Sequence, residues 1–271
     1  MKKIVCFLSI SALVLIESCS TNPFTGKKTL ALVSNDQLFP QAFQQYGQFL
    51  SENKVVLGTA EAKRVEKVGM KIKAAAERWL TANGKASVLQ GYQWEYKLVD
   101  NKEVNAWCMP GGKIVFYTGI LPITNDEATM AAVMGHEVAH ALADHGAQRM
   151  SAGMLQQLGG VAVAVGTQNQ TPEKQAMWNQ AFGIGSQVGV MLPFSRDHES
   201  EADMIGLNLM AIAGYDPKNA VTVWERMSAK GGQAPPEFMS THPSNETRIA
   251  KITSQIPAAK AEAAKFGVVF K

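Results

Sequence analysis

The chain has 271 residues, of which 46% are hydrophobic, 18% charged and 8% aromatic, and its formal net charge is +3 at pH 7. This composition is typical of a globular protein and excludes collagen-like, coiled-coil and wholly disordered chains. The sequence has no run of five like charges and no Cys-x-x-Cys pair, so no nucleic-acid partner and no disulfide framework are expected.

The first residues have the character of an export signal. A basic start precedes an apolar run from Ile4 to Ile16, which is too short to span a bilayer. The following Ile16-Glu17-Ser18-Cys19 resembles a bacterial lipobox, whose cysteine receives the lipid. We therefore expect residues 1–18 to be a lipoprotein signal peptide and Cys19 to be the lipidated first residue of the mature chain. The alternative is an ordinary secretory signal that is cleaved nearby.

The amino-terminal half is expected to contain two helices and two strands. Residues 19–35 are polar and rich in turn formers, which predicts a tether. A helix from Gln37 to Leu50 follows, and Thr59 is a suitable cap for a second helix to Leu80, whose apolar residues recur at helical spacing. Alternating apolar residues predict a strand from Tyr92 to Val99, and a second strand is expected from Lys113 to Thr118.

The carboxy-terminal half is expected to be helical. A helix from about Asn125 to Arg149 is followed by a small, apolar stretch at 153–166, which predicts either a buried helix or a mobile flap over a cleft. Further helices are expected before Pro193, up to Ala213, from Pro217, from Asn245 to Ile256 and from Ala258 to Phe266. The pattern predicts one mainly helical α+β domain with a small β-sheet over residues 36–271.

His136-Glu137-Val138-Ala139-His140 lies within the expected helix from Asn125. Four residues rotate a helix by about 400°, so both imidazoles project from one face and can reach a single metal ion. Glu137 lies about 100° from His136 around the helix, close enough to hold a water molecule without ligating the metal. This is the H-E-x-x-H pattern of zinc hydrolases. Its apolar surroundings strengthen the interpretation, because histidines without partners there would lose their hydration.

A catalytic zinc site needs a third protein ligand. Glu199 and Asp203 share a helix face, so Glu199 is expected to ligate and Asp203 to accept the outer N–H of a ligand histidine. Glu201 lies on roughly the opposite face and is expected to be solvated. His145 lies about 140° from the ligand face if the first helix continues, which predicts a structural histidine. The alternative for the acidic segment is a charged, exposed helix face.

Four motifs occur in one order and together resemble a known peptidase family. They are His136 to His140, Ser195 to Asp203, Asn105 to Gly112 and Thr241 to Ile249. The chain is similar to the gluzincin zinc metallopeptidases, the family of HtpX and of the OMA-type and CAAX prenyl endopeptidases. With its lipobox, it is most similar to the periplasmic lipoprotein branch typified by BepA and LoiP. The resemblance covers residues from Asp36 to Ile256 and implies a zincin-like fold.

The resemblance implies one Zn²⁺ per chain and a role for each matched residue. The implied zinc ligands are His136, His140 and Glu199. Glu137 would act as general base and then as proton donor, and Asp203 would orient a ligand histidine.

The resemblance also implies roles for residues outside the helical motifs. His242 would stabilise the oxyanion or take the fourth coordination position in a latent state, and the alternative is a turn histidine before Pro243. Arg248 would pair with a carboxylate near the site or brace its loop. Residues 105–118 would line the cleft as an edge strand and loop. Cys108 is expected to be a small, partly buried turn residue, with a thiolate that blocks the metal as the alternative.

These expectations predict a zinc metalloendopeptidase that is lipid-anchored on the periplasmic side of the bacterial envelope, and Ser20 after the lipidated cysteine favours the outer membrane. Its expected partners are unfolded or misassembled envelope proteins and, through the anchor, the membrane. One alternative is a lipid-anchored, chaperone-like binding factor with a structural or latent metal site, which would not need Glu137. The other is an envelope scaffold whose histidines bind no metal.

Overall fold

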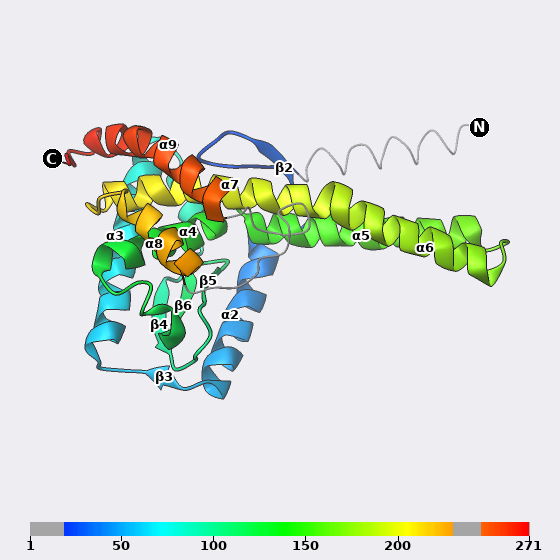
Figure 1. The fold of residues 1–271 in the computed structure, drawn as a ribbon, viewed down its shortest axis with the longest axis horizontal. Coiled ribbons are helices and arrows are strands. Elements are labelled where there is room, and N and C mark those ends of the chain that lie inside the picture. The colour runs from blue at the N-terminus through cyan, green and yellow to red at the C-terminus, as the bar shows by residue number, and fades with distance from the viewer. Residues whose placement is uncertain (1–18, 230–244, 271) are drawn as a thin grey trace.

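A computed structural model describes residues 19–229 and 245–270 of the chain (Figure 1). The expected signal peptide at 1–18 and His242 lie outside the described residues. The fold is mainly helical with a small four-stranded sheet and a separate two-stranded hairpin, which confirms the α+β prediction. Within the described residues, none of the helices has both the length and the apolar character needed to cross a bilayer.

The four-stranded sheet has the order β3-β4-β6-β5. Its strands are β3 (Val55–Val56), β4 (Glu95–Val99), β5 (Ala106–Met109) and β6 (Lys113–Tyr117). Strands β4 and β6 are parallel, whereas β5 runs antiparallel to β6 and forms one edge. The turn between β5 and β6 requires positive φ at Gly111 and Gly112 (83° and 87°), which glycine adopts without strain. Both expected strands are confirmed, although the first begins only at Glu95.

The helices carry most of the chain. They are α2 (Asn35–Glu52), α3 (Ala60–Ala82), α4 (Glu127–Leu142), α5 (His145–Thr167), α6 (Pro172–Ser186), α7 (Leu192–Ile212), α8 (Asn219–Ala229) and α9 (Asn245–Ala264). Thr59 caps α3 as predicted, because its hydroxyl accepts a hydrogen bond from the backbone N–H of Ala62. Helix α4 lies at the centre and packs against α3, α7, α8 and β5 (Figure 1).

Helices α4 and α7 cross in backbone contact at two glycines. A Cβ atom built on Gly135 would lie 2.7 Å from the carbonyl oxygen of Gly206, and one on Gly206 would lie 2.6 Å from the backbone nitrogen of His136. Real Cβ atoms do not approach backbone so closely. The two glycines therefore allow the helix that carries His136 to touch the helix that carries Glu199.

We expect Gly206→Ala to destabilise the protein by about 1–3 kcal/mol, because the added methyl group forces two helix backbones apart. Urea unfolding followed by circular dichroism measures this loss. Gly153→Ala is the matched control, since Gly153 lies within α5 and nothing surrounds its Cβ position. An unfolding midpoint for Gly206→Ala equal to that of wild type would contradict the proposed close crossing.

The amino-terminal segment differs from the sequence prediction. The residues expected to form a tether instead form a β-hairpin, β1 (Cys19–Thr21) paired with β2 (Lys28–Leu30). Phe24 in its turn stacks on Trp79 of α3 with ring centroids 4.4 Å apart. The prediction of a tether was wrong because turn-forming residues also build hairpins when an apolar side chain anchors them.

The helix boundaries after Leu142 also differ. The helix expected to continue to Arg149 ends at Leu142, because Asp144 adopts left-handed backbone geometry (φ 55°) and a new helix starts at His145. No helix ends at Pro193, in contrast to the prediction. A π-helical turn at Gln187–Met191 leads directly into α7, and the proline lies in the first turn of α7, where it is tolerated. At the carboxy terminus, the two expected helices form the single helix α9, with Pro257 inside it.

Candidate metal centre

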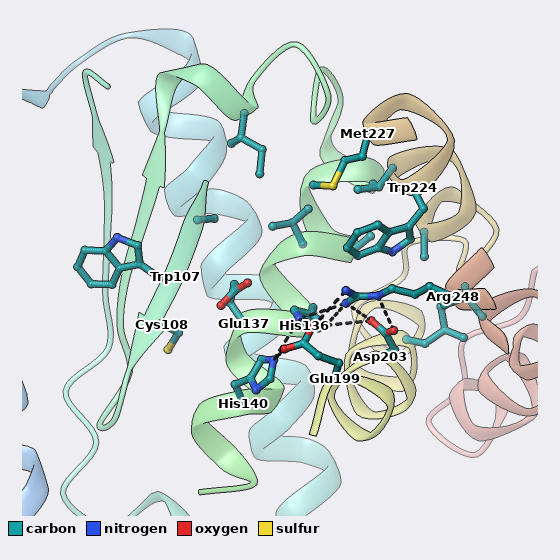
Figure 2. A pocket seen from close by; sticks show the side chains of 18 of the residues that line it. Trp107, Cys108, His136, Glu137, His140, Glu199, Asp203, Trp224, Met227 and Arg248 are labelled. Carbon is teal, nitrogen blue, oxygen red and sulfur yellow. Dashed lines mark hydrogen bonds and ion pairs between the residues drawn. The ribbon is translucent and has the colours of Figure 1, made fainter. Parts of the chain in front are cut away.

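The three predicted ligands come together where α4 crosses α7 (Figure 2). The Nε2 atoms of His136 and His140 lie 3.1 Å apart. Glu199 reaches them from α7, with Oε1 at 3.3 Å from Nε2 of His140 and Oε2 at 3.4 Å from Nε2 of His136. Two imidazoles one helical turn apart and one carboxylate from a second helix thus converge on one point.

The donor set and its spacing fit zinc. Bonds from zinc to nitrogen or oxygen are about 2.0–2.1 Å long, so neighbouring ligand atoms of a tetrahedral site lie about 3.3 Å apart. The Nε2–Nε2 separation of 3.1 Å is close to this value, as are the separations of 3.3 and 3.4 Å from the two different oxygens of Glu199. One donor atom from each of the three residues lies within 4.8 Å of the other two. Two histidines and one glutamate are also a typical ligand set of catalytic zinc, which keeps the fourth position open. His136, His140 and Glu199 would therefore hold the ion.

The outer nitrogen of His136 is oriented as predicted. Its Nδ1 lies 2.9 Å from Oδ1 of Asp203. Arg248 donates two hydrogen bonds to the same carboxylate, from Nε to Oδ2 (2.7 Å) and from Nη2 to Oδ1 (2.6 Å). Burial raises the pKa of Asp203, but the bonds with His136 and Arg248 outweigh it and lower the pKa below its usual value. Asp203 is thus a carboxylate that fixes the ring of His136.

Arg248 is a buried part of the site. Its side chain is 3% exposed, and Nη1 lies 3.2 Å from Oε2 of Glu199. The guanidinium carbon lies 3.6 Å from the ring centroid of Trp224, which covers its face. Of the two predicted roles for Arg248, the structure shows the pairing with carboxylates. Trp224 was not expected here, because no short motif links it to the metal ligands.

The outer nitrogen of His140 has a different set of partners. Its Nδ1 lies 2.8 Å from Nδ1 of His145, and Nε2 of His145 lies 2.9 Å from Oε2 of Glu201. Thr25 donates a further hydrogen bond to Oε1 of Glu201, at 2.8 Å. With Nε2 of His140 facing the metal position, its Nδ1–H donates to His145, whose own Nε2–H donates to Glu201. These contacts orient the ring of His140.

One expectation about this second set of residues needs correction. Glu201 was expected to be solvated, but its side chain is only 11% exposed and is bonded to His145. His145, predicted to be structural, is not among the grouped metal-binding side chains of the described residues. It is fully buried and contacts His140, because the left-handed residue Asp144 turns it back toward that ring, a contact that a continuous helix would not make.

We expect His145→Phe to weaken zinc binding by about 10- to 100-fold, because the ring of His140 loses the acceptor that orients it. Competition with a fluorescent chelator measures the affinity. His145→Asn should recover part of the loss, since its amide oxygen can take the place of Nδ1. Equal zinc affinity in wild type and His145→Phe would show that the contact does not orient the ligand.

The three predicted ligands line a cleft of about 530 Å³, together with Glu137 (Figure 2). Loss of hydration in the cleft is the main reason why the pKa of Glu137 is raised to about 7. The charge of Glu199 also raises it, while His136 and Arg248 oppose the shift. A carboxylate whose pKa lies near neutrality can both accept and return a proton, which is the requirement for a general base that later acts as an acid.

The wall opposite α8 is the edge strand β5, as predicted for residues 105–118. Cys108 faces the cleft from β5 and not from a turn, and it is a free thiol. Burial, and then the charge of Glu137, hold its pKa well above the usual value, which favours the neutral thiol over a thiolate. Cys108 is also not among the grouped metal-binding side chains of the described residues. Arg149, Trp224 and Met227 also line the cleft and were not predicted.

Comparison with known proteins agrees with this geometry. Residues 63–256 match Peptidase family M48. The mitochondrial metalloendopeptidase OMA1 of Arabidopsis thaliana is 40% identical over 174 residues, which cover 64% of this chain and 34% of that protein. The mitochondrial metalloendopeptidase OMA1 of Bos taurus is 28% identical over 246 residues, which cover 88% of this chain and 46% of that protein.

A bacterial relative is also similar. The beta-barrel assembly-enhancing protease of Escherichia coli (strain K12) is 30% identical over 166 residues, covering 58% of this chain and 33% of that protein. The chain thus spans about a third to a half of the length of these relatives. Because the family match includes both helices that carry the grouped ligands, this chain belongs to peptidase family M48.

Proposed function

We propose that the protein is a zinc-dependent endopeptidase. The observation that carries this proposal is the triangle of His136, His140 and Glu199, whose donor atoms lie within 4.8 Å of one another and which shares its cleft with Glu137. A purely structural zinc site is closed by protein ligands and needs no adjacent acid. The presence of Glu137 in the same cleft therefore favours hydrolysis over a chaperone-like factor with a structural metal.

The chain's own residues supply the proton transfers and the positioning. When bound, zinc activates a water molecule and polarises the carbonyl group of the scissile peptide. Glu137 takes a proton from that water and then donates it to the nitrogen of the leaving amine, so no covalent enzyme intermediate is needed. Asp203 and His145 hold the rings of His136 and His140 in place throughout. The edge strand β5 pairs with an extended substrate through its free backbone groups.

Pairing with a sheet edge selects for extended, unfolded polypeptide rather than for one sequence. We infer that the substrates are misfolded or misassembled envelope proteins and that the enzyme is anchored through Cys19 on the periplasmic side, in the outer membrane. The lipobox-like sequence before Cys19 supports this location, as does the similarity to a bacterial protease named for β-barrel assembly. Cell fractionation tests it: the wild-type chain should be found in the outer membrane, and Cys19→Ser should lose this attachment.

Metal analysis and casein cleavage, measured on the same purified protein, test the activity. We expect one zinc ion per chain and cleavage that a chelator abolishes and added zinc restores. Zinc binding without any cleavage would support the chaperone-like alternative. Protein that takes up no zinc would support the non-metal scaffold.

A further inference from the structure

Helices α5 and α6 project from the body of the protein as a long hairpin (Figure 1). The sequence of this hairpin is almost without charge: between Arg149 and Arg196, the charged residues are Glu173 and Lys174. The stretch at 153–166, expected to be a buried helix or a flap over a cleft, instead lies along this exposed hairpin. The prediction of burial was wrong, because the apolar side chains of this stretch have no cover within the described fold.

Five exposed apolar side chains of α5 form a stripe along one face of the helix, while Leu155 (48% exposed) lies outside it. Successive members are three or four residues apart, which keeps them within about 80° of one another around the helix. They are Met150 (40% exposed), Met154 (42%), Leu158 (64%), Val161 (60%) and Val165 (58%). We call these five residues the α5 stripe.

The α5 stripe does not serve to hold the hairpin together, because another face of α5 packs on α6. Gln156 donates a hydrogen bond to the hydroxyl of Ser186 on α6, at 2.9 Å. The Cβ position of Gly159 lies 2.6 Å from the ring of Phe182. On α6, Met177 and Trp178 are also more than half exposed (56% and 52%).

The base of the hairpin lies beside the strand that begins at Cys19. The hydroxyl of Ser20 donates to Oδ2 of Asp144 at 3.3 Å, immediately before α5 begins. The backbone N–H of Leu32 donates to the hydroxyl of Ser151 within α5, at 2.8 Å. A lipid on Cys19 would therefore bring a membrane surface to the root of this nearly uncharged hairpin.

We propose that the α5–α6 hairpin lies on the membrane, with the α5 stripe inserted at the boundary between lipid headgroups and acyl chains. An apolar helix face with few charged neighbours fits this boundary, where charged side chains are costly to bury. The neighbouring anchor residue favours lipid over a second copy of the chain or an unfolded substrate. The inference rests on the proposed location of the protein in the envelope.

The natural tryptophan on α6 provides the test. The protein is purified from bacterial membranes, so that any signal cleavage and lipid on Cys19 are retained. It is then mixed with phosphatidylethanolamine–phosphatidylglycerol vesicles that contain brominated or unmodified acyl chains. The difference between wild type and Trp178→Phe isolates the fluorescence of Trp178. We expect brominated lipid to quench this fluorescence and the paired change Leu158→Gln/Val161→Gln to remove most of the quenching.

The matched control is Leu57→Gln/Val269→Gln, which removes a leucine and a valine that are even more exposed (73% and 80%) and lie outside the hairpin. Quenching that persists in this control supports the proposal. An unquenched Trp178 in wild type, or equal quenching in both paired variants, overturns it. A wild-type dimer that the stripe variant dissociates, without quenching by lipid, assigns the stripe to a second copy instead. Casein cleavage by each variant tests the peptidase activity separately.

Discussion

Replacing Glu137 with glutamine is expected to abolish the cleavage of casein while zinc stays bound. The amide of Glu137→Gln has nearly the same shape as the carboxyl group but cannot take a proton from water or return one to the leaving amine. General acid–base catalysis contributes about 10²- to 10⁴-fold to such reactions, so we expect a rate loss of that size. His136, His140 and Glu199 remain in place in this variant, which predicts an unchanged zinc content.

Steady-state cleavage rates and metal analysis of the same preparations measure both effects. Glu173→Gln is the matched control, because it makes the same chemical change at an exposed position in the first turn of α6. Turnover that is unchanged in Glu137→Gln would reject the proposed mechanism. A loss of zinc together with activity would show that Glu137 supports the metal rather than the proton transfer.

Glu199→Gln and Glu201→Gln are expected to affect zinc binding differently. Glu199 is the predicted third ligand, whereas Glu201 contacts His145. Glu199 is 5% exposed and supplies the only carboxylate of the ligand triangle, so its neutral variant should lose most of the bound zinc. The same change also leaves Arg248 without one of its two carboxylate partners. Glu201→Gln should retain zinc with weaker affinity, since it changes the acceptor of His145 and of Thr25 but none of the three predicted ligands.

Atomic emission measures the zinc content of the two variants, and circular dichroism checks that each of them is folded. A Glu199→Gln protein that is folded and carries a full complement of zinc would contradict the assignment of the third ligand. Complete zinc loss in Glu201→Gln with retention in Glu199→Gln would reverse the two roles.

The local parts of the site could be predicted from the sequence. Helical periodicity alone places His136 and His140 on one face and Glu199 with Asp203 on another, and the structure brings the two faces together. The cap at Thr59 and the buried stripe of α3 could also be predicted, because each depends on residues that are neighbours along one helix.

What the sequence does not reveal depends on contacts between distant segments. The role of His145 follows from one left-handed residue, Asp144, and no glycine marks that position. Trp224, on α8, covers the guanidinium of Arg248, but no sequence motif links these two residues. Gly135 and Gly206 have no sequence signal of their own, since a glycine inside a helix shows its purpose only when the partner helix is known.

The hairpin of α5 and α6 also has a topological consequence. It is the stretch of chain that connects the ligand pair on α4 to the third ligand on α7. A single proteolytic nick in the exposed turn at 168–170 would leave two fragments, with two zinc-binding side chains on one and the third on the other. The ion would then cross-link separate polypeptides, so chelation would loosen their association.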